Sequence, residues 1–467
     1  MGSKRKENSV TNILLITADD MDGNTPGSFG GPHDATPNLD RLAADGMTFH
    51  RGHVPAAVCQ PSRSALMTGM WPHRNGAEGF EPIDDGIGVI NDQLKDAGYR
   101  VGILGKVGHI QPVERFQWDM AVDMRQLGLG RNPAAYGSRT EEFITAAVRE
   151  GRPWFLMANA HDPHRPFHGS AAEREFWTEE ERSEYPEPSK VFSADEVEVP
   201  GFLPDIPGVR EEYAEYLSSS RRCDDVVGEV LAALERTSTA DQTLVIFLSD
   251  NGMAFPFAKA NCYLRSTLTP LIVRWPGVTT PGSNNDEAFV NMLDLYPTFC
   301  DAAGVPAPPN IDGKSLTPLL TGGQEPDRDR VFTVFHETSA KQRFEMRCVQ
   351  DSQYGYIWNG WADGRTQYRA ENMWGLSWPA MLEAAENNEA IRRRADFYRT
   401  RAREELYDLS TDPDCLTNLA GNPDFEPVLT RTRNSLSRWM TTTGDPMAAE
   451  FHAGTRLAVS HTAATTP

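Results

Sequence analysis

Hydrophobic runs and helical patterns alternate over the first 330 residues of the chain. Short apolar runs predict buried strands, and apolar residues three or four positions apart predict helices with one buried face. The predicted strands cover residues 13–18, 99–104, 154–160, 243–249 and 271–275, and the predicted helices lie near 36–47, 90–97, 143–148 and 213–234. Because strand and helix alternate, we expect an α/β fold with a mostly parallel sheet between two layers of helices.

The predicted helices carry start and stop signals. Thr36-Pro37 supplies an N-cap and a first-turn proline for the first helix, whose apolar face runs to Met47. Gly98 and Gly151 follow two later helical patterns at the position where glycine commonly ends a helix. These boundaries leave room for a strand after each helix.

The pattern changes beyond Gly322-Gly323. Strand-like runs follow one another closely at 331–335, 346–350 and 354–358, and a helix is predicted near 425–440. This order predicts a larger domain at 1–330 and a smaller antiparallel α+β domain at 331–467. The Ala/Thr-rich end of the chain, from about residue 453, is expected to fray.

The chain is acidic, with 45 basic and 66 acidic residues and a net charge of -21. Nucleic-acid binding relies on basic patches that displace counterions from phosphates, so no nucleic-acid partner is expected. The acidic excess is typical of a soluble protein. An anionic small molecule stays compatible with it, because a metal ion and a few basic side chains can reverse the field locally.

The beginning of the chain does not resemble a targeting signal. Residues 1–10 are polar, and the apolar run at 13–18 ends at Asp19-Asp20, too early for a signal peptide or a membrane span. The sequence therefore predicts a cytoplasmic protein, or one whose leader has been removed, and no membrane partner. The six cysteines show no framework spacing, so reduced thiols are expected. A homo-oligomer is left open.

Polar residues interrupt the apolar pattern directly after four predicted strands. Asp19-Asp20 follow the first, Lys106 and His109 the second, residues 161–165 the third, and Asp250-Asn251 the fourth. Sites in open α/β sheets form at the carboxyl ends of strands, so these segments are expected to converge. Three carboxylates and an amide are hard oxygen ligands of the kind that Ca²⁺ or Mg²⁺ takes. A cap or a turn is the alternative, because Asp-Asn-Gly is also a common turn sequence.

Two further signals are weaker. The segment His161-Asp162-Pro163-His164-Arg165 is strongly polar for the end of a buried strand, where such a cluster is costly unless it binds something. A satisfied loop network is the alternative. Lys106 follows an apolar run, where a surface lysine is less expected, whereas Lys259 on its own is compatible with an ordinary surface position.

The most specific segment is Cys59-Gln60-Pro61-Ser62-Arg63. An isolated cysteine is more often a small core residue than a nucleophile. This pentapeptide, however, matches the Cys-x-Pro-Ser-Arg signature of the formylglycine-dependent sulfatases, and residues 64–69 after it also resemble that family. In that family a modifying enzyme converts the cysteine into an aldehyde, so the resemblance implies a formylglycine-generating enzyme as a maturation partner.

The resemblance extends over nearly the whole chain. Residues 36–43 resemble the family's first helix, 249–252 its second metal segment, and 405–409 with 412–413 and 418–420 its C-terminal signature. Residues 161–165, 249–256 with Asn261, and 401–408 look closest to the N-sulfoglucosamine sulfohydrolases. The resemblance implies an alkaline-phosphatase-like fold with the catalytic domain first, and hydrolysis of a sulfamate or sulfate ester on a small glycan, with N-sulfoglucosamine as the leading substrate.

The resemblance also implies a role for each candidate residue. A calcium ion, or magnesium as the alternative, would be held by Asp19, Asp20, Asp250, Asn251 and the modified Cys59. Arg63 would orient the hydrated aldehyde, Lys106 would bind sulfate oxygens, and His109 would be the base that breaks down the sulfated intermediate. The leaving group would face His161 and Lys259.

Further substrate contacts implied by the resemblance are His164, Arg165, His336, Glu337 and Arg347. For the last three, which fall in the predicted second domain, a structural ion pair in a small sheet is an equally good interpretation.

This set of residues makes chemical sense. A thiolate would be trapped as a stable thiosulfate ester, whereas an aldehyde hydrate offers one hydroxyl to attack sulfur and a second whose deprotonation expels sulfate. A cation lowers the pKa of that hydroxyl, and basic side chains stabilise charge on the transferred group. A histidine with a pKa near neutral can shuttle the proton.

Three positions depart from the family pattern. Lys106 and His109 are three residues apart, where the family usually spaces them by two. Lys259 stands where the sulfamidases have arginine, and Met70 stands where the longer modification motif often has arginine.

Three alternatives remain open on the sequence. An O-sulfatase acting on aryl or sugar sulfates would use the same site, and a phosphodiesterase or phosphonate hydrolase of the same superfamily is a second alternative. If Cys59 stays a thiol, a noncatalytic glycan-binding protein is the third. The polar set beside the cysteine argues against the last, because a pure binder has little use for it.

Overall fold

The computed structural model describes residues 11–462, with side chains to residue 455. Residues 1–10, on which the expectation about a leader rests, and residues 463–467 lie outside the described range. Within that range an eight-stranded sheet runs in the spatial order β5 (Met120–Val122), β4 (Arg100–Leu104), β6 (Trp154–Asn159), β1 (Asn12–Ala18), β7 (Thr243–Ser249), β8 (Leu271–Arg274), β2 (Met47–Phe49) and β9 (Ser283–Asn285). From β5 to β7, each strand is parallel to the next one in this order. The predicted fold class, α/β with a mostly parallel sheet, is confirmed.

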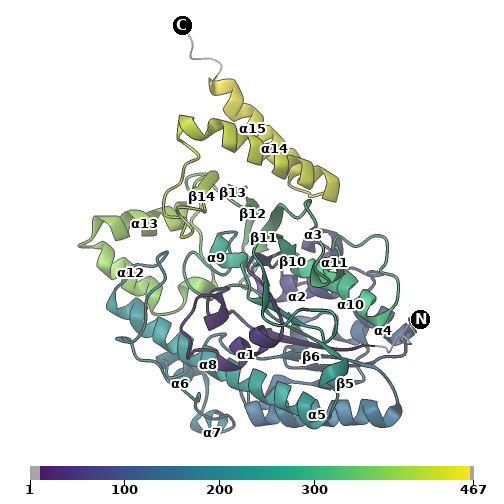
Figure 1. Cartoon of the computed structure of the whole chain (residues 1–467). Helices are drawn as coiled ribbons and strands as arrows, with labels where there is room; N and C mark the ends of the chain where they lie inside the picture. Colours follow the sequence, from purple (N-terminus) through teal and green to yellow (C-terminus); the bar gives the residue numbers. More distant parts are fainter. Residues whose placement is uncertain (1–10, 463–467) are drawn as a thin grey trace.

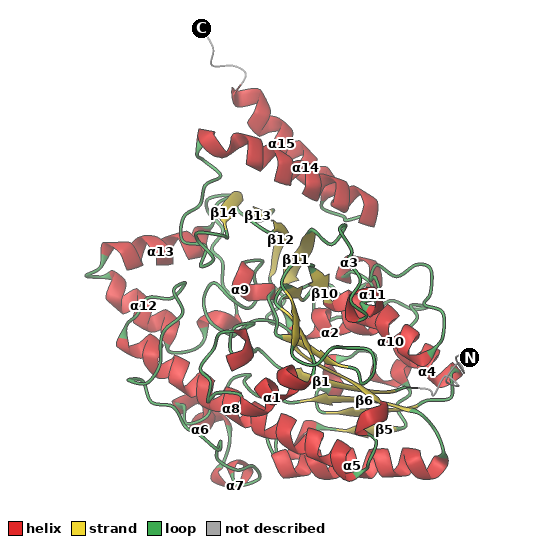
Figure 2. Cartoon of the chain, viewed as in Figure 1, coloured by secondary structure: helices red, strands yellow, loops and turns green. Residues whose placement is uncertain are grey.

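Helices cover both faces of this sheet (Figure 2). Successive residues of a strand point to opposite faces, so Ile13 and Leu15 of β1 join one core and Leu14 and Ile16 join the other. The first core is closed by α2 (Cys59–Thr68), α4 (Ile90–Asp96), α10 (Leu295–Ala303) and α11 (Thr317–Leu320), and the second by α1 (Pro37–Asp45), α5 (Pro133–Glu150) and α8 (Pro207–Arg236). Strands buried on both faces explain the continuous apolar runs of the sequence.

Three local predictions are corrected by the structure. Met47 does not extend the first helix, because α1 ends at Asp45 and Met47 begins β2. Thr36 precedes α1 as expected, but its hydroxyl accepts a hydrogen bond from the backbone N–H of Gly27 at 3.3 Å instead of capping the helix. Strand β8 is antiparallel to β7. The segment between them contains only the short α9 (Leu264–Thr267), and an antiparallel neighbour needs no long crossover helix.

A second, four-stranded antiparallel sheet follows, as the sequence predicts. Its order is β11 (Arg330–Glu337), β12 (Arg343–Asp351), β13 (Tyr354–Asn359) and β14 (Glu404–Asp408). Between β13 and β14 lie α12 (Ser377–Ala385) and α13 (Glu389–Thr400), which the sequence analysis did not predict. The boundary at residues 330 and 331 coincides with the start of β11, and the division into two domains stays a prediction.

The second sheet is covered on both faces. One face packs against α14 (Glu426–Thr443) and α15 (Ala448–Thr462), the helices at the top of Figure 1. The other face packs with α12 and α13 against α8 and residues 253–263 of the larger part. Residues 453–462, where fraying is expected, are helical in α15. The other α-helices and strands are short: α3 (Pro72–Asn75), α6 (Ala171–Phe176), α7 (Glu179–Arg182), and a small sheet of β3 (Gly52–His53) with β10 (Val290–Asn291).

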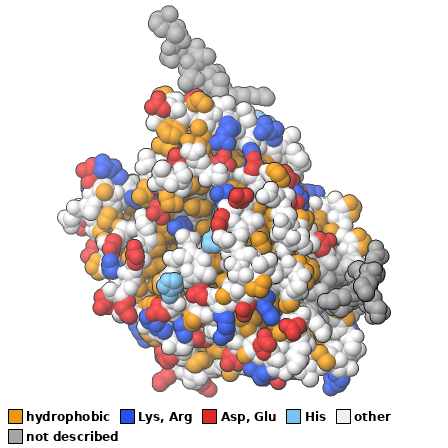
Figure 3. Space-filling model, in the orientation of Figure 1, with side chains coloured by type: hydrophobic (Ala, Val, Ile, Leu, Met, Phe, Trp, Pro, Cys, Tyr) orange, Lys and Arg blue, Asp and Glu red, His pale blue; other side chains and the backbone are white. Residues whose placement is uncertain are grey.

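The distribution of charged side chains and the state of the cysteines can be compared with the expectations from the sequence. Acidic and basic side chains are mixed over the face that Figure 3 shows. All six cysteines are free and buried. Within the described residues, we find no helix whose length and hydrophobicity would let it cross a membrane.

Candidate active site

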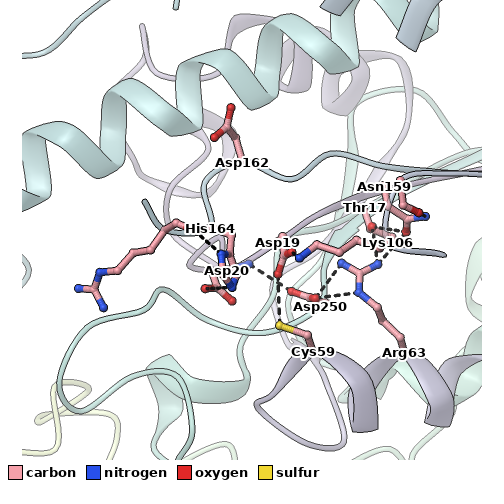
Figure 4. A network of polar contacts seen from close by, with 12 residues as sticks. Thr17, Asp19, Asp20, Cys59, Arg63, Lys106, Asn159, Asp162, His164 and Asp250 are labelled. Atoms are coloured by element: carbon pink, nitrogen blue, oxygen red, sulfur yellow. Dashed lines mark hydrogen bonds and ion pairs between the residues drawn. The ribbon is translucent and has the colours of Figure 1, made fainter. Parts of the chain in front are cut away.

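The four polar segments that follow strands lie at one edge of the main sheet. Strands β4, β6, β1 and β7 are adjacent and parallel, so their carboxyl ends share that edge. The first residue of α2 is Cys59, and its thiol lies 3.4 Å from Oδ1 of Asp19, which follows β1 (Figure 4). The convergence expected from the sequence is therefore present.

The thiol of Cys59 is enclosed by charged groups. Its side chain is 3% exposed, and Nζ of Lys259 lies 3.3 Å from its sulfur. Burial, and next the carboxylate of Asp19, raise the pKa of this thiol well above its usual value. Only the thiolate is a good nucleophile, so the unmodified cysteine is poorly suited to attack a substrate at neutral pH.

Arg63 connects α2, the helix that begins with Cys59, to the ends of three strands. It lies on α2, one turn after Cys59, and is fully buried. Its Nε and Nη2 lie 3.0 and 2.7 Å from Oδ2 of Asp250. Its Nη1 donates to Oγ1 of Thr17 at 3.1 Å and to Oδ1 of Asn159 at 2.7 Å. Thr17 and Asn159 were not predicted as site residues. Each is a polar residue near the carboxyl end of an otherwise apolar strand, and this sequence feature could have indicated them.

The acidic cluster is suited to a hard cation. Asp19, Asp20, Asp250 and Asn251 are all completely buried. The amide of Asn251 donates to Oδ1 of Asp20 at 2.7 Å, and the backbone N–H of Asp20 donates to Oδ1 of Asp250 at 3.2 Å. Among the described residues, Oδ2 of Asp20 and Oδ1 of Asn251 have no hydrogen-bond partner. Buried oxygens without a donor are rare in native proteins, and carboxylate and amide oxygens are the ligands that Ca²⁺ and Mg²⁺ take.

Basic residues balance the three carboxylates. Nζ of Lys259 lies 2.6 Å from Oδ1 of Asp20, and Lys106 pairs with Oδ2 of Asp19. Burial raises the pKa of Asp19, but Lys106 and other cationic neighbours outweigh it and hold that pKa well below its usual value. Burial raises the pKa of Asp250 to about 7, in spite of Arg63. The protein part of the site is thus close to neutral overall, so an added divalent cation would make it attractive to an anion.

Three histidines border the charged cluster. The rings of His161 and His164 lie 5.1 Å apart, and Nε2 of His164 lies 3.9 Å from Oδ2 of Asp20. Burial, and next the charge of Lys106, lower the pKa of His109 to about 3 and that of His161 well below its usual value. Both rings are therefore neutral at pH 7, and each has a nitrogen that can accept a proton.

The sequence predicts His164 as a substrate contact, but in the structure it lies beside the acidic cluster. The ligand atoms of Asp19, Asp20, Cys59 and His164 all lie within 4.8 Å of one another. The structure brings this histidine to the same point as the predicted metal ligands.

The segment that carries Lys259 is held by the C-terminal part of the chain. The amide of Asn372 donates to the carbonyl of Lys259 at 2.5 Å, and the hydroxyl of Tyr368 donates to the carbonyl of Ala260 at 2.6 Å. Phe257 and Ala260 both have left-handed backbones, with φ of 65° and 62°, a conformation that persists only when its surroundings enforce it. No local sequence signal points to Asn372 or Tyr368, because their partners lie more than 100 residues away.

Within the segment 161–165, two residues have structural partners. Asp162 is buried between Arg131 and Arg222, at 3.0 and 2.7 Å. Arg165 pairs with Glu212 at 2.6 Å, and its guanidinium lies over the ring of Phe167. Asp162 is therefore part of a satisfied loop network. Arg165 also donates to the backbone carbonyl of Glu371 at 3.3 Å, and so lies beside the site.

The candidates on the second sheet form a separate cluster. Nδ1 of His336 lies 2.9 Å from Glu345, and fully buried Arg347 pairs with Asp445 at 2.5 Å and with Glu345 at 3.0 Å. These contacts are those of a structural ion pair. Glu337 is buried, and its Oε1 has no hydrogen-bond partner among the described residues. The roles of all three as substrate contacts stay predictions.

Comparison with known protein families agrees with this fold and site. The sulfatase family model matches residues 11–305, and a second model, N-sulphoglucosamine sulphohydrolase C-terminal, matches residues 254–363. The chain belongs to the sulfatase family and is a sulfatase.

Particular relatives match most of the chain. Human N-sulphoglucosamine sulphohydrolase is 31% identical, over 93% of this chain and 91% of that protein. An ulvan-active sulfatase of Formosa agariphila is 28% identical, over 93% of this chain and 80% of that protein.

Solved structures share the fold at lower identity. A protein in complex with its substrate D-glucosamine-2-N,6-O-disulfate has a TM-score of 0.69 at 18% identity, over 94% of this chain and 99% of that one. The phosphonate monoester hydrolase of Agrobacterium radiobacter has a TM-score of 0.67 at 19% identity, over 93% of this chain and 96% of that one.

Proposed function

We propose that this sulfatase removes sulfate from the sulfamate of N-sulfoglucosamine, using a hydrated formylglycine made from Cys59. The observation that carries the proposal is the position of Cys59 within its motif. At the head of α2 its sulfur lies 3.4 Å from Asp19 and 3.3 Å from Lys259, with Arg63 one turn further on. The sulfamate is supported by the match of residues 254–363 to the C-terminal model of N-sulphoglucosamine sulphohydrolases.

A divalent cation, calcium in our proposal, would be held by Asp19, Asp20, Asp250 and Asn251. When bound, it would lower the pKa of the attacking hydroxyl and offset the negative charge of the substrate. Arg63 is locked by Asp250, Thr17 and Asn159, and so presents a fixed positive charge beside the modified side chain. Lys106 would hold sulfate oxygens, and the neutral ring of His109 would accept the proton whose loss expels sulfate.

A sulfamate makes a particular demand on the leaving-group side. Its leaving group is an amine, which must gain a proton as the nitrogen–sulfur bond breaks. Lys259 is an ammonium donor beside the sulfur of Cys59, and His161 and His164 lie at the same edge of the sheet. Lys259 would donate the proton to the departing sugar amine, and the neutral rings of His161 and His164 would orient it.

The proposal is tested by mass and by activity. The peptide that contains Cys59 is weighed in protein made together with a formylglycine-generating enzyme, and sulfate release is then measured from N-sulfoglucosamine and from an aryl sulfate. An aldehyde mass with release from the sulfamate is expected. Release from the aryl ester alone would keep the nucleophile and reject the substrate, and an unmodified thiol would reject the nucleophile.

A sugar O-sulfatase is the second candidate. Lys259 stands where the resemblance to sulfamidases predicts arginine, and one relative is named for activity on the sulfated polysaccharide ulvan. A panel of sugar O-sulfates, sulfamates and phosphate esters separates the candidates, because the preferred substrate is the one with the highest kcat/KM.

Removal of divalent cations is expected to abolish sulfate release and to lower Tm. A ligand that binds only the folded state at about 100 times its Kd adds about 2.7 kcal/mol to the free energy of unfolding. Treatment with a chelator, followed by titration with Ca²⁺ or Mg²⁺, is monitored by thermal unfolding and by activity. The matched variant Asp20→Asn should lose the cation-dependent rise in Tm. An unchanged Tm and unchanged activity after chelation would contradict the proposed site.

A further inference from the structure

Glu371 is a buried carboxylate without a partner. Its side chain is 9% exposed, and neither of its carboxylate oxygens accepts a hydrogen bond from any residue that the structure describes. It begins a short helical turn, Glu371–Met373, between β13 and α12. A buried carboxylate is strongly disfavoured unless it is paired or hydrogen-bonded, so an unpaired one calls for an external donor.

This carboxylate lies next to the nucleophile site. The residue after it, Asn372, donates to the carbonyl of Lys259 at 2.5 Å. The carbonyl of Glu371 itself accepts a hydrogen bond from Arg165 at 3.3 Å. Glu371 is also close enough to Lys259 for its charge to act on that ammonium group. Its neighbours are thus the two basic residues that border the leaving-group side of the site.

Those basic residues already have other partners. Lys259 pairs with Asp20 at 2.6 Å, and Arg165 pairs with Glu212 at 2.6 Å. The contact of Lys259 is buried and that of Arg165 is partly buried, and each uses the charge that would otherwise neutralise Glu371. In the described part of the chain, the carboxylate therefore keeps its full capacity to accept hydrogen bonds.

The segment that carries Glu371 is fixed from several sides. The amide of Asn372 also donates to the hydroxyl of Tyr398 at 2.7 Å, and the backbone N–H of Ser377 donates to Glu212 at 2.7 Å. Gly375 lies so close to Glu212 that an added Cβ would be 1.6 Å from its Oε1. A side chain at this position would displace the carboxylate of Glu212 and disturb its contacts with Arg165 and Ser377, so the segment packs closely against α8 while the carboxylate of Glu371 is left without a donor. This arrangement is that of a preorganised binding group.

We propose that Glu371 binds the sugar of the substrate, by accepting a hydrogen bond from a hydroxyl or amino group beside the sulfated atom. A carboxylate is an acceptor only, and a sugar presents several donors around each sulfated position. An aryl sulfate has no such donor next to the reacting group. Glu371 thus makes the site selective for glycan substrates over aryl sulfates. This inference rests on the proposed function in taking a sulfated sugar as the substrate.

The test compares two substrates in the full-length modified enzyme. Glu371→Gln keeps the shape of the side chain and removes its charge. It is expected to lower kcat/KM for N-sulfoglucosamine by about tenfold, because the amide oxygen can still accept a hydrogen bond but no longer carries a charge. The value of kcat/KM for 4-nitrophenyl sulfate should change little. Tm should stay the same or rise, because an unpaired buried charge has been removed.

A second variant controls for the loss of one negative charge. Glu383→Gln removes one negative charge from an exposed position on α12 and should leave both substrates unaffected. Equal losses for sugar and aryl substrates in Glu371→Gln, or no loss for the sugar, would overturn the inference. A lower Tm together with loss of both activities would show a structural role and overturn it as well.

Failure of the proposed function has a different signature. If the unmutated enzyme releases sulfate from a sugar O-sulfate and not from the sulfamate, the proposed substrate is wrong. The role of Glu371 is then tested with that sugar O-sulfate: Glu371→Gln should lower kcat/KM for the sugar and leave kcat/KM for the aryl sulfate nearly unchanged. An unmutated enzyme that hydrolyses aryl sulfates alone would overturn both.

Discussion

Replacing Cys59 by alanine is expected to lower kcat/KM for every sulfated substrate by at least about a thousandfold. The variant keeps the acidic cluster and the basic residues around it, but it has no side chain that can become the nucleophile. Tm should fall only slightly, through the small cavity that loss of the sulfur leaves, because Lys259 keeps its pairing with Asp20. Sulfate release, the mass of the peptide and Tm check the three parts of this expectation.

A matched control comes from another buried cysteine. Cys300 is completely buried in α10 and belongs to the core on one face of the main sheet, a core that does not include Cys59. Cys300→Ala should lower Tm through the small cavity that it leaves, while kcat/KM stays unchanged. Full activity in Cys59→Ala would refute the nucleophile, and parallel losses in both variants would point to a general loss of folding instead.

The strands that build the site could be predicted because their surroundings are uniform. β1 and β7 are buried on both faces along their whole length, so they appear in the sequence as unbroken apolar runs that end abruptly in acidic residues. The direction of β8 could not be predicted in this way. Its composition is the same for a parallel and an antiparallel neighbour, and only the connection at residues 250–270, which holds the short α9 in place of a long crossover helix, distinguishes them.

The parts of the candidate site that could be predicted are those whose residues lie close together in the sequence. Cys59 and Arg63 occur in one motif, and Asp19 and Asp20 follow one strand, so their proximity needs only the parallel sheet. The partner of Arg347 could not be foreseen, because Asp445 lies 98 residues further along the chain. The sequence leaves a substrate-binding and a structural arginine equally plausible, and the structural partner of Arg347 becomes visible only through long-range pairing.

The same long-range contacts join the two sheets at the site. Lys259 belongs to the segment after β7, but Asn372 and Tyr368 hold that segment from the C-terminal part of the chain. The segment between β13 and α12 therefore contributes to the geometry of the candidate site, and a shared hydrophobic core joins the two parts of the chain.

Arg63→Lys is expected to lower kcat by about a hundredfold or more and also to lower Tm. Arginine donates in three directions at once, to Asp250, Thr17 and Asn159, all of which are completely buried. A lysine keeps the positive charge but has one compact ammonium group, which cannot replace a planar guanidinium. Each buried acceptor that loses its donor costs about 1–3 kcal/mol. Thermal unfolding and single-turnover sulfate release measure the two effects separately.

The control for this prediction is another buried arginine and aspartate pair. Arg328 lies 2.6 Å from Asp294, and both side chains are 7% exposed, but neither contacts the nucleophile. Arg328→Lys should lower Tm while kcat stays the same, whereas Arg63→Lys should change both. If the two variants lose stability alike and both keep full kcat, then Arg63 only connects α2 to the sheet, and the charge beside Cys59 must come from Lys106, Lys259 and the cation.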